Sequence, residues 1–98
     1  MELILKHTDK SVHDIMELTG YKTIHFQGDG EFSIVRPIRR GGYPRFHLYG
    51  VQQNSTIILN LHLEQRRPSY ENVDSHTGET EGSEIKEEMA RIEKLLNA

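Results

Sequence analysis

Two stretches near the middle of the chain alternate between an apolar side and a mainly polar side, and their pairing constrains the fold more than any other feature. Residues 45–50 and 57–64 place apolar residues at every second position. Side chains on a strand point alternately to the two faces of a sheet. A slip of one residue between the two strands would expose leucines, so the numbers of paired residues must sum to an odd value.

The register with a sum of 107 closes the hairpin at Gln53-Asn54 and pairs Phe46 with Leu61. In that register His47 and His62 are diagonal neighbours, about 7–8 Å apart. A register in which the paired residue numbers sum to 109 would place His47 and His62 directly opposite each other. Both registers collect the same polar patch, which comprises Arg45, His47, Tyr49, Asn60, His62 and Glu64. Arg36 joins this patch if the preceding strand contributes the same face.

The elements before this hairpin have clear boundaries. Ser11 and Asp14 have the spacing of a capping box, and Gly20 ends the short helix that they begin. Residues 21–27 and 31–37 are rich in β-branched and aromatic side chains and flank Gly28-Asp29-Gly30, a hairpin signal. Residues 2–5 are compatible with a short edge strand or with an extension of the helix.

The last third of the chain is polar and then helical. Residues 64–83 form a long polar loop, and an amphipathic helix starts at Ser83. Its apolar stripe comprises Ile85, Met89, Ile92 and Leu96, while Glu87 and Arg91 form an i,i+4 pair. We therefore expect one α+β domain over residues 1–98: an N-terminal helix, a four-stranded antiparallel meander, the long loop, and a C-terminal helix packed on the sheet.

Charge divides the chain into three parts. Residues 1–31 and 70–98 carry net charges of −3 and −5, whereas residues 32–69 carry six arginines against one acid. Cysteine is absent, which excludes disulfides, thiolate metal sites and a cysteine nucleophile. The first residues resemble neither a signal peptide nor a membrane span, so a cytoplasmic protein without a membrane partner is expected.

The basic segment suggests a binding rim. Arg39 and Arg40 precede a Gly-Gly pair, and arginines grip phosphate while aromatic rings offer stacking planes. A second basic-aromatic segment, with Arg66, Arg67 and Tyr70, should leave the sheet at the same end. The candidate ligand-binding residues are Arg36, Arg39, Arg40, Tyr43, Arg45, Tyr49, Asn60, Arg66, Arg67 and Tyr70. They favour a binding module for a phosphate-bearing ligand such as nucleic acid, although no RRM, KH, zinc-finger or helix-turn-helix signature is present.

A phosphoester hydrolase is the alternative from a different class. His47 and His62 would act as the catalytic acid–base pair, with arginine stabilising the developing charge. If the enzyme were metal-dependent, His47, His62 and His76 would be the ligands of a divalent cation. Otherwise no cofactor is expected.

Two further alternatives need no small ligand. The arginines of the middle segment could be neutralised by the acidic ends of the same chain. The acidic C-terminal helix could instead bind another protein, as an adaptor, or a second copy of the chain, as a homodimer.

Overall fold

The computed structural model describes residues 1–26, 28–65 and 78–97. The protein is a small α+β domain with an antiparallel sheet and a C-terminal helix. Its elements are β1 (Glu2–Leu5), α1 (Val12–Thr19), β2 (Lys22–Phe26), β3 (Glu31–Pro37), β4 (Arg45–Gln53), β5 (Thr56–Glu64), β6 (Gly78–Glu79) and α2 (Ser83–Leu96).

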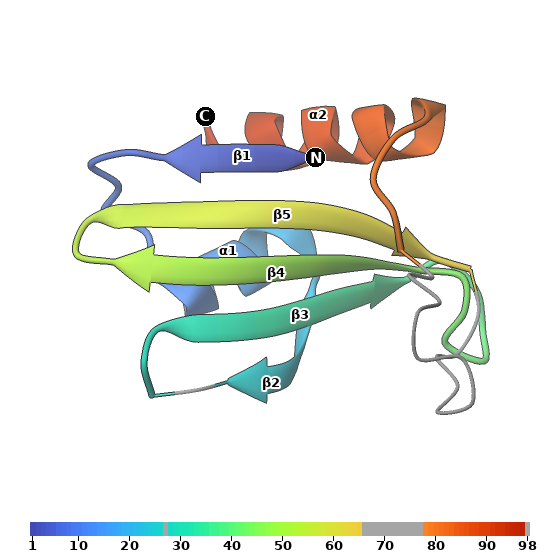
Figure 1. Ribbon diagram of the computed structural model, residues 1–98, viewed down its shortest axis with the longest axis horizontal. Coiled ribbons are helices and arrows are strands. Elements are labelled where there is room, and N and C mark those ends of the chain that lie inside the picture. The colour runs from blue at the N-terminus through green and yellow to red at the C-terminus, as the bar shows by residue number, and fades with distance from the viewer. Residues whose placement is uncertain (27, 66–77, 98) are drawn as a thin grey trace.

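The main sheet has five strands in the order β1-β5-β4-β3-β2, and the two-residue β6 pairs with the far end of β5. In Figure 1, α1 lies behind β4 and β5, and α2 runs beside β1 at the top of the view. Two expectations are wrong here, because the chain begins with a strand rather than a helix, and because the sheet has more than four strands. Residues 2–5 form the additional strand by pairing with β5, more than fifty residues away in the sequence.

Local sequence explains where α1 begins and ends. The Ser11 hydroxyl accepts a hydrogen bond from the Asp14 N–H (3.1 Å), and the Asp14 carboxylate accepts one from the Ser11 N–H (2.9 Å). This reciprocal capping box satisfies two N–H groups that a helix start leaves unpaired. At the other end Gly20 adopts a left-handed φ of 83°, which glycine reaches without a Cβ clash.

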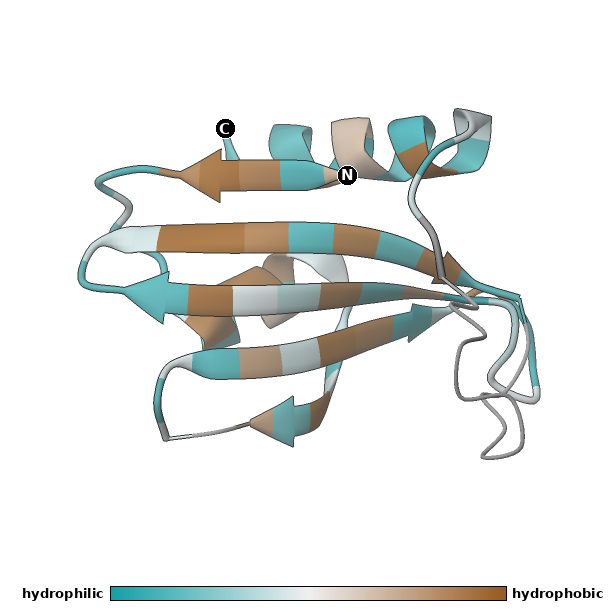
Figure 2. Cartoon of the chain, in the orientation of Figure 1, coloured by the Kyte–Doolittle hydropathy of each residue, from teal (hydrophilic) through white to brown (hydrophobic). Residues whose placement is uncertain are grey.

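The core lies between the sheet and the two helices. Alternate residues of β3, β4 and β5 point toward it, and the alternation of hydropathy along β5 is visible in Figure 2. The largest fully buried apolar side chains are Ile15, Ile34, Leu48, Ile57, Leu59, Leu61, Leu63, Ile85, Ile92 and Leu96. Gly50 allows the Phe32 ring to lie directly over the β4 backbone, where any Cβ would overlap the ring. All four residues of the expected α2 stripe are buried.

The β4–β5 hairpin has the expected parity but not the favoured register. Its paired residues sum to 109, so His47 lies directly opposite His62 and Phe46 opposite Leu63. The strands continue to Gln53 and Thr56, and the turn is Asn54-Ser55 rather than Gln53-Asn54. Asn54 has a φ of 56°, a left-handed conformation that asparagine tolerates well in two-residue hairpin turns.

A buried carboxylate fastens α2 to the sheet. Glu88 is only 4% exposed and accepts hydrogen bonds from Arg36 of β3 (2.9 and 3.0 Å) and from the Tyr21 hydroxyl (2.7 Å). Arg91 also donates to Glu88 (2.8 and 3.0 Å) and to the Thr19 carbonyl at the end of α1 (2.7 Å). The expected pair between Arg91 and Glu87 is therefore replaced by an i,i+3 pair with Glu88.

Membrane insertion by a helix finds no support in the described part of the chain: neither α1 nor α2 is long and apolar enough to cross a bilayer.

The Glu88 cluster makes the fold sensitive to acid. Burial by itself raises the pKa of Glu88, but the hydrogen bonds from Arg91, Arg36 and Tyr21 outweigh it and lower this pKa to about 2. The folded pKa lies below the unfolded value, so the stabilisation is present above pH 4.5 and is lost as the pH falls from 4.5 toward 2. That loss should amount to about 3 kcal/mol of unfolding free energy in urea titrations across this range. Glu88→Gln should lose about 3 kcal/mol of unfolding free energy at pH 7, because it removes the buried charge that Arg36, Arg91 and Tyr21 stabilise. A variant that unfolds at the same urea concentration as the wild type would contradict this.

Candidate ligand-binding face

The side of the sheet that neither helix covers carries the candidate site, and we call it the open face. The registers of β2, β3, β4 and β5 assign its residues, since directly paired residues share a face. They include His25, Ser33, Val35, Arg45, His47, Tyr49, Val51, Ile58, Asn60, His62 and Glu64. All six members of the predicted polar patch therefore lie together on this face.

Arg36 does not belong to the open face. Its backbone pairs with Phe46, so its side chain points to the helix side, where it reaches Glu88 and lies 5.4 Å from the centre of the Phe46 ring. Val35 occupies the position opposite His47 instead. The condition under which Arg36 would join the polar patch is therefore not met.

Glu64 organises one end of the open face. It is 6% exposed and accepts hydrogen bonds from Arg45 Nε (2.6 Å) and from His47 Nδ1 (3.1 Å). Burial raises the pKa of Glu64, but these two hydrogen bonds outweigh that effect and leave it below the ordinary value. Glu64 is thus an ionised carboxylate that can only accept hydrogen bonds. His47 must therefore carry a proton on Nδ1 to donate to it.

A row of rings follows along β4 and β5. The imidazole of His47 stacks on Tyr49 with centroids 3.9 Å apart, and Tyr49 lies 5.0 Å from His62 in a tilted arrangement. His47 is 4% exposed, and its Nε2 atom is buried without a hydrogen-bond partner among the described residues. Burial lowers the pKa of both His47 and His62. Both imidazoles are therefore neutral at pH 7.

Tyr49 is the accessible ring of this row. It is 41% exposed, although it lies on a central strand of the sheet. Beside it is a pocket of about 330 Å³. Its lining combines the polar residues His25, Glu31, Ser33 and Asn60 with Phe32, Gly50 and Val51. The pocket is thus bordered by an aromatic plane and by hydrogen-bonding side chains.

The loop between β3 and β4 places two more cations at one end of the sheet. Arg39 and Arg40 are exposed, and neither forms an ion pair within the described ranges. Gly41 and Gly42, with φ values of 91° and 92°, allow the chain to turn there. Arg45, by contrast, is held between Glu64 and the Tyr43 ring, which lies 4.6 Å away. Among the described residues, the predicted arginines therefore divide into two exposed cations, Arg39 and Arg40, and two that are bound internally, Arg36 and Arg45.

The metal hypothesis gains no support from the described residues, among which no group of three or more histidine, aspartate or glutamate side chains could hold a metal ion. His76 lies outside the described residues, as do Arg66, Arg67 and Tyr70. The direct pairing of His47 with His62 supplies two imidazoles, but the Nδ1 of His47 is occupied by Glu64.

Sequence reasoning missed three polar residues of the site. Ser33 and His25 come to the pocket through the register of β3 with β4 and of β2 with β3, which includes a bulge between Thr23 and His25. Glu31 lies at the start of β3 and also lines the pocket. The alternation used for β4 and β5 also applies to β3. Ser33 lies between Phe32 and Ile34, which both belong in the core, so its side chain was predictable on the opposite face. The bulge has no sequence signal that would have placed His25.

Comparisons with known proteins do not identify the chain, because no family model, curated protein or solved structure matches it.

The buried His47 should make the fold less stable at mildly acidic pH. Its folded pKa lies below the unfolded value of 6.5, so the unfolded chain binds more protons as the pH falls through 6.5. The unfolding free energy should therefore decrease between pH 7.5 and 5.5, by at most about 1.4 kcal/mol per pH unit from this group. His47→Phe keeps a ring against Tyr49 and should show a smaller decrease in urea unfolding at the two pH values. An unchanged decrease in this variant would assign the effect to other groups.

Proposed function

We propose that this protein is a binding module whose open face takes a single-stranded nucleic acid. The observation that carries the proposal is the exposed Tyr49 ring on a central strand, next to a polar-rimmed pocket. Every nucleobase has a π-face that stacks on such a ring. Asn60 and Glu31 at the pocket rim supply acceptors for the exocyclic amino groups of a base.

The position of the free cations favours an extended ligand. Tyr49 and Arg45 are four residues apart on β4, which corresponds to about 13 Å along the strand. Arg39 and Arg40 lie beyond that point, in the loop that precedes β4. A mononucleotide stacked on Tyr49 would not reach them. A single strand laid along β4 would place a base on Tyr49 and downstream phosphates near the two arginines.

The first test concerns stacking. Tyr49→Ala should weaken the binding of a fluorescently labelled single-stranded oligonucleotide about tenfold or more, since stacking on one aromatic side chain contributes about 1–3 kcal/mol per base. Fluorescence anisotropy at low salt measures the affinity. Phe26→Ala is the matched control, because Phe26 is also an exposed aromatic residue but shares a face with Phe32, on the helix side. Equal affinity for wild type and Tyr49→Ala would refute the stacking role.

The second test concerns the phosphates. The double variant Arg39→Ala/Arg40→Ala should bind more weakly and should reduce the slope of log affinity against log salt by about 1.4, if each arginine neutralises one phosphate. Lys86→Ala/Lys94→Ala removes the same charge from exposed positions on α2 and should leave the slope unchanged. Absence of any oligonucleotide binding by the wild type at low salt would overturn the proposed function.

Phosphoester hydrolysis is the second candidate, and the Glu64–His47 hydrogen bond favours it. A carboxylate on Nδ1 orients an imidazole and leaves Nε2 as the base. That Nε2 atom is buried, however, so a substrate could not reach it without rearrangement of its neighbours. Cleavage of the oligonucleotide during the binding assay, abolished by His62→Ala, would favour the hydrolase over the binding module.

A further inference from the structure

The outer edge of β1 presents unpaired backbone groups. Met1 and Leu61 exchange two backbone hydrogen bonds (2.8 and 3.2 Å), so this pair is of the hydrogen-bonded kind. Because such pairs alternate in an antiparallel ladder, the N–H and C=O groups of Glu2 and Ile4 point away from β5. No described residue forms a hydrogen bond with these groups. The edge is therefore available to another strand.

The sequence of this edge is complementary to itself. Residues 2–6 read Glu-Leu-Ile-Leu-Lys, with an acid and a base placed symmetrically about Ile4. β1 ends at Leu5, and Lys6 begins the turn that follows it. If two copies pair in antiparallel fashion with Ile4 opposite Ile4, Glu2 of each copy lies opposite the position of Lys6 at the start of this turn in the other. Opposite charges in such positions stabilise a strand pair. This register also gives the outward N–H and C=O groups of Ile4 hydrogen-bond partners, because they face the same groups of Ile4 in the second copy.

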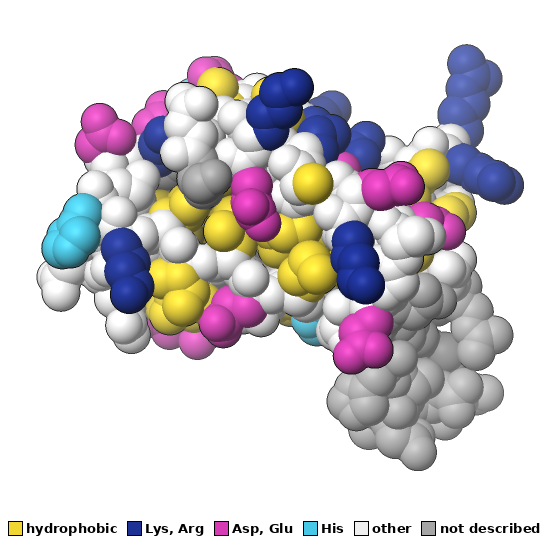
Figure 3. Space-filling model, turned by 90° about the horizontal axis from the view of Figure 1, so that it is seen from above, with side chains coloured by type: hydrophobic (Ala, Val, Ile, Leu, Met, Phe, Trp, Pro, Cys, Tyr) yellow, Lys and Arg dark blue, Asp and Glu magenta, His cyan; other side chains and the backbone are white. Residues whose placement is uncertain are grey.

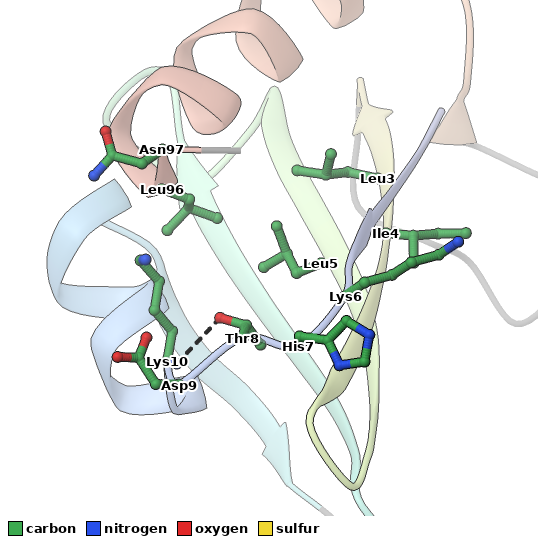
Figure 4. Close-up of a pocket in the computed structure, with 10 residues that line it drawn as sticks. All are labelled: Leu3, Ile4, Leu5, Lys6, His7, Thr8, Asp9, Lys10, Leu96 and Asn97. Carbon is green, nitrogen blue, oxygen red and sulfur yellow. Dashed lines mark hydrogen bonds between the residues drawn. The ribbon is translucent and has the colours of Figure 1, made fainter.

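Side-chain direction agrees with this register. In Figure 4, Leu3 and Leu5 point toward Leu96 at the end of α2, whereas Ile4 and Lys6 point away from them. Ile4 is 43% exposed, and Glu2 and Lys6 are exposed as well. Both charged pairs and the Ile4 contact would thus form on the open-face side of the joined sheet.

Apolar surface accompanies the edge. A pocket of about 320 Å³ lies between β1 and the end of α2, and it is lined in part by Leu3, Leu5 and Leu96. Seen from this side, hydrophobic side chains form a band across the molecule with charged side chains around it (Figure 3). An incoming strand would cover part of this band, which adds apolar burial to the strand pairing.

The other edge of the sheet lacks these properties. β2 contains the bulge between Thr23 and His25, and bulges are a common means of blocking edge pairing. Pairing of β2 with itself about Ile24 would set Lys22 opposite Phe26 and would form no ion pair.

We propose that the chain forms a symmetric dimer in which the β1 strands of two copies pair antiparallel about Ile4. The two five-stranded sheets then continue into one another across the two-fold axis. The contact is isologous, with each copy contributing the same strand. This inference stands independently of the nucleic-acid proposal.

The experiment is charge reversal with rescue, measured on the full chain by sedimentation equilibrium over a concentration series at low salt. The wild type should approach twice the mass of the chain. Glu2→Lys and Lys6→Glu, each alone, place like charges opposite each other twice and should weaken the dimer roughly tenfold. The double variant Glu2→Lys/Lys6→Glu restores opposite charges and should recover dimerisation. Lys22→Glu on β2 is the matched control and should dimerise like the wild type.

Each alternative result overturns the proposal. A wild type that remains monomeric at every concentration would mean that β1 is free or that it pairs with a different protein. A dimer that tolerates both single reversals uses another surface. A double variant as weak as the single variants would show that Glu2 and Lys6 do not face each other. Circular dichroism of each variant establishes that loss of the dimer is not loss of the fold.

Discussion

The pairing of β4 with β5 is the constraint on which the rest of the structure depends. It directs Phe46, Leu48, Leu61 and Leu63 to one side of the sheet, and this apolar surface must be covered for the chain to fold. Both helices provide that cover. The opposite side consequently receives the polar residues Arg45, His47, Tyr49, Asn60, His62 and Glu64, without a helix over it. The same alternation of side chains along β4 and β5 thus produces the core on one side of the sheet and the candidate site on the other.

Two buried carboxylates, one on each side of the sheet, bind two arginines of the basic middle segment. Glu88 binds Arg36 on the helix side, and Glu64 binds Arg45 on the open face. Only the pair with Glu88 joins the middle segment to an acidic end of the chain, as one of the alternatives from sequence expected, because Glu64 lies within the middle segment itself. This leaves Arg39 and Arg40 as exposed cations in the described part of that segment. A ligand would be attracted by a small, localised positive charge rather than by a broad basic surface.

Sequence predicted the features that depend on periodicity and failed where the answer depends on distant pairing. The alternation predicted which side of β4 and β5 each residue faces, and the helical period predicted the α2 stripe. Sums of 107 and 109 have the same parity, so burial does not distinguish them. Both registers also close a two-residue loop that contains Asn54, and in the structure Asn54 is the first residue of that loop, with a left-handed φ of 56°. β1 is too short for a periodic signal, and its place beside β5 follows from tertiary pairing. Sequence did not determine which face of the sheet Arg36 occupies, because the neighbouring Ile34 and Val35 are both apolar and both buried, which obscures the alternation along β3.

The open face and the β1 edge are related by geometry, although different residues form them. Directly paired residues in an antiparallel ladder point to the same face, so pairing Ile4 with its counterpart requires a two-fold axis perpendicular to the sheet. Such an axis leaves the open faces of both copies on the same side. Tyr49 of each copy would then lie on one continuous surface, and a single strand long enough to contact both would be held by two sites at once. Linked sites of modest affinity bind much more tightly than either alone. If both proposals hold, one exposed ring on the open face of each chain would be sufficient to retain an extended ligand.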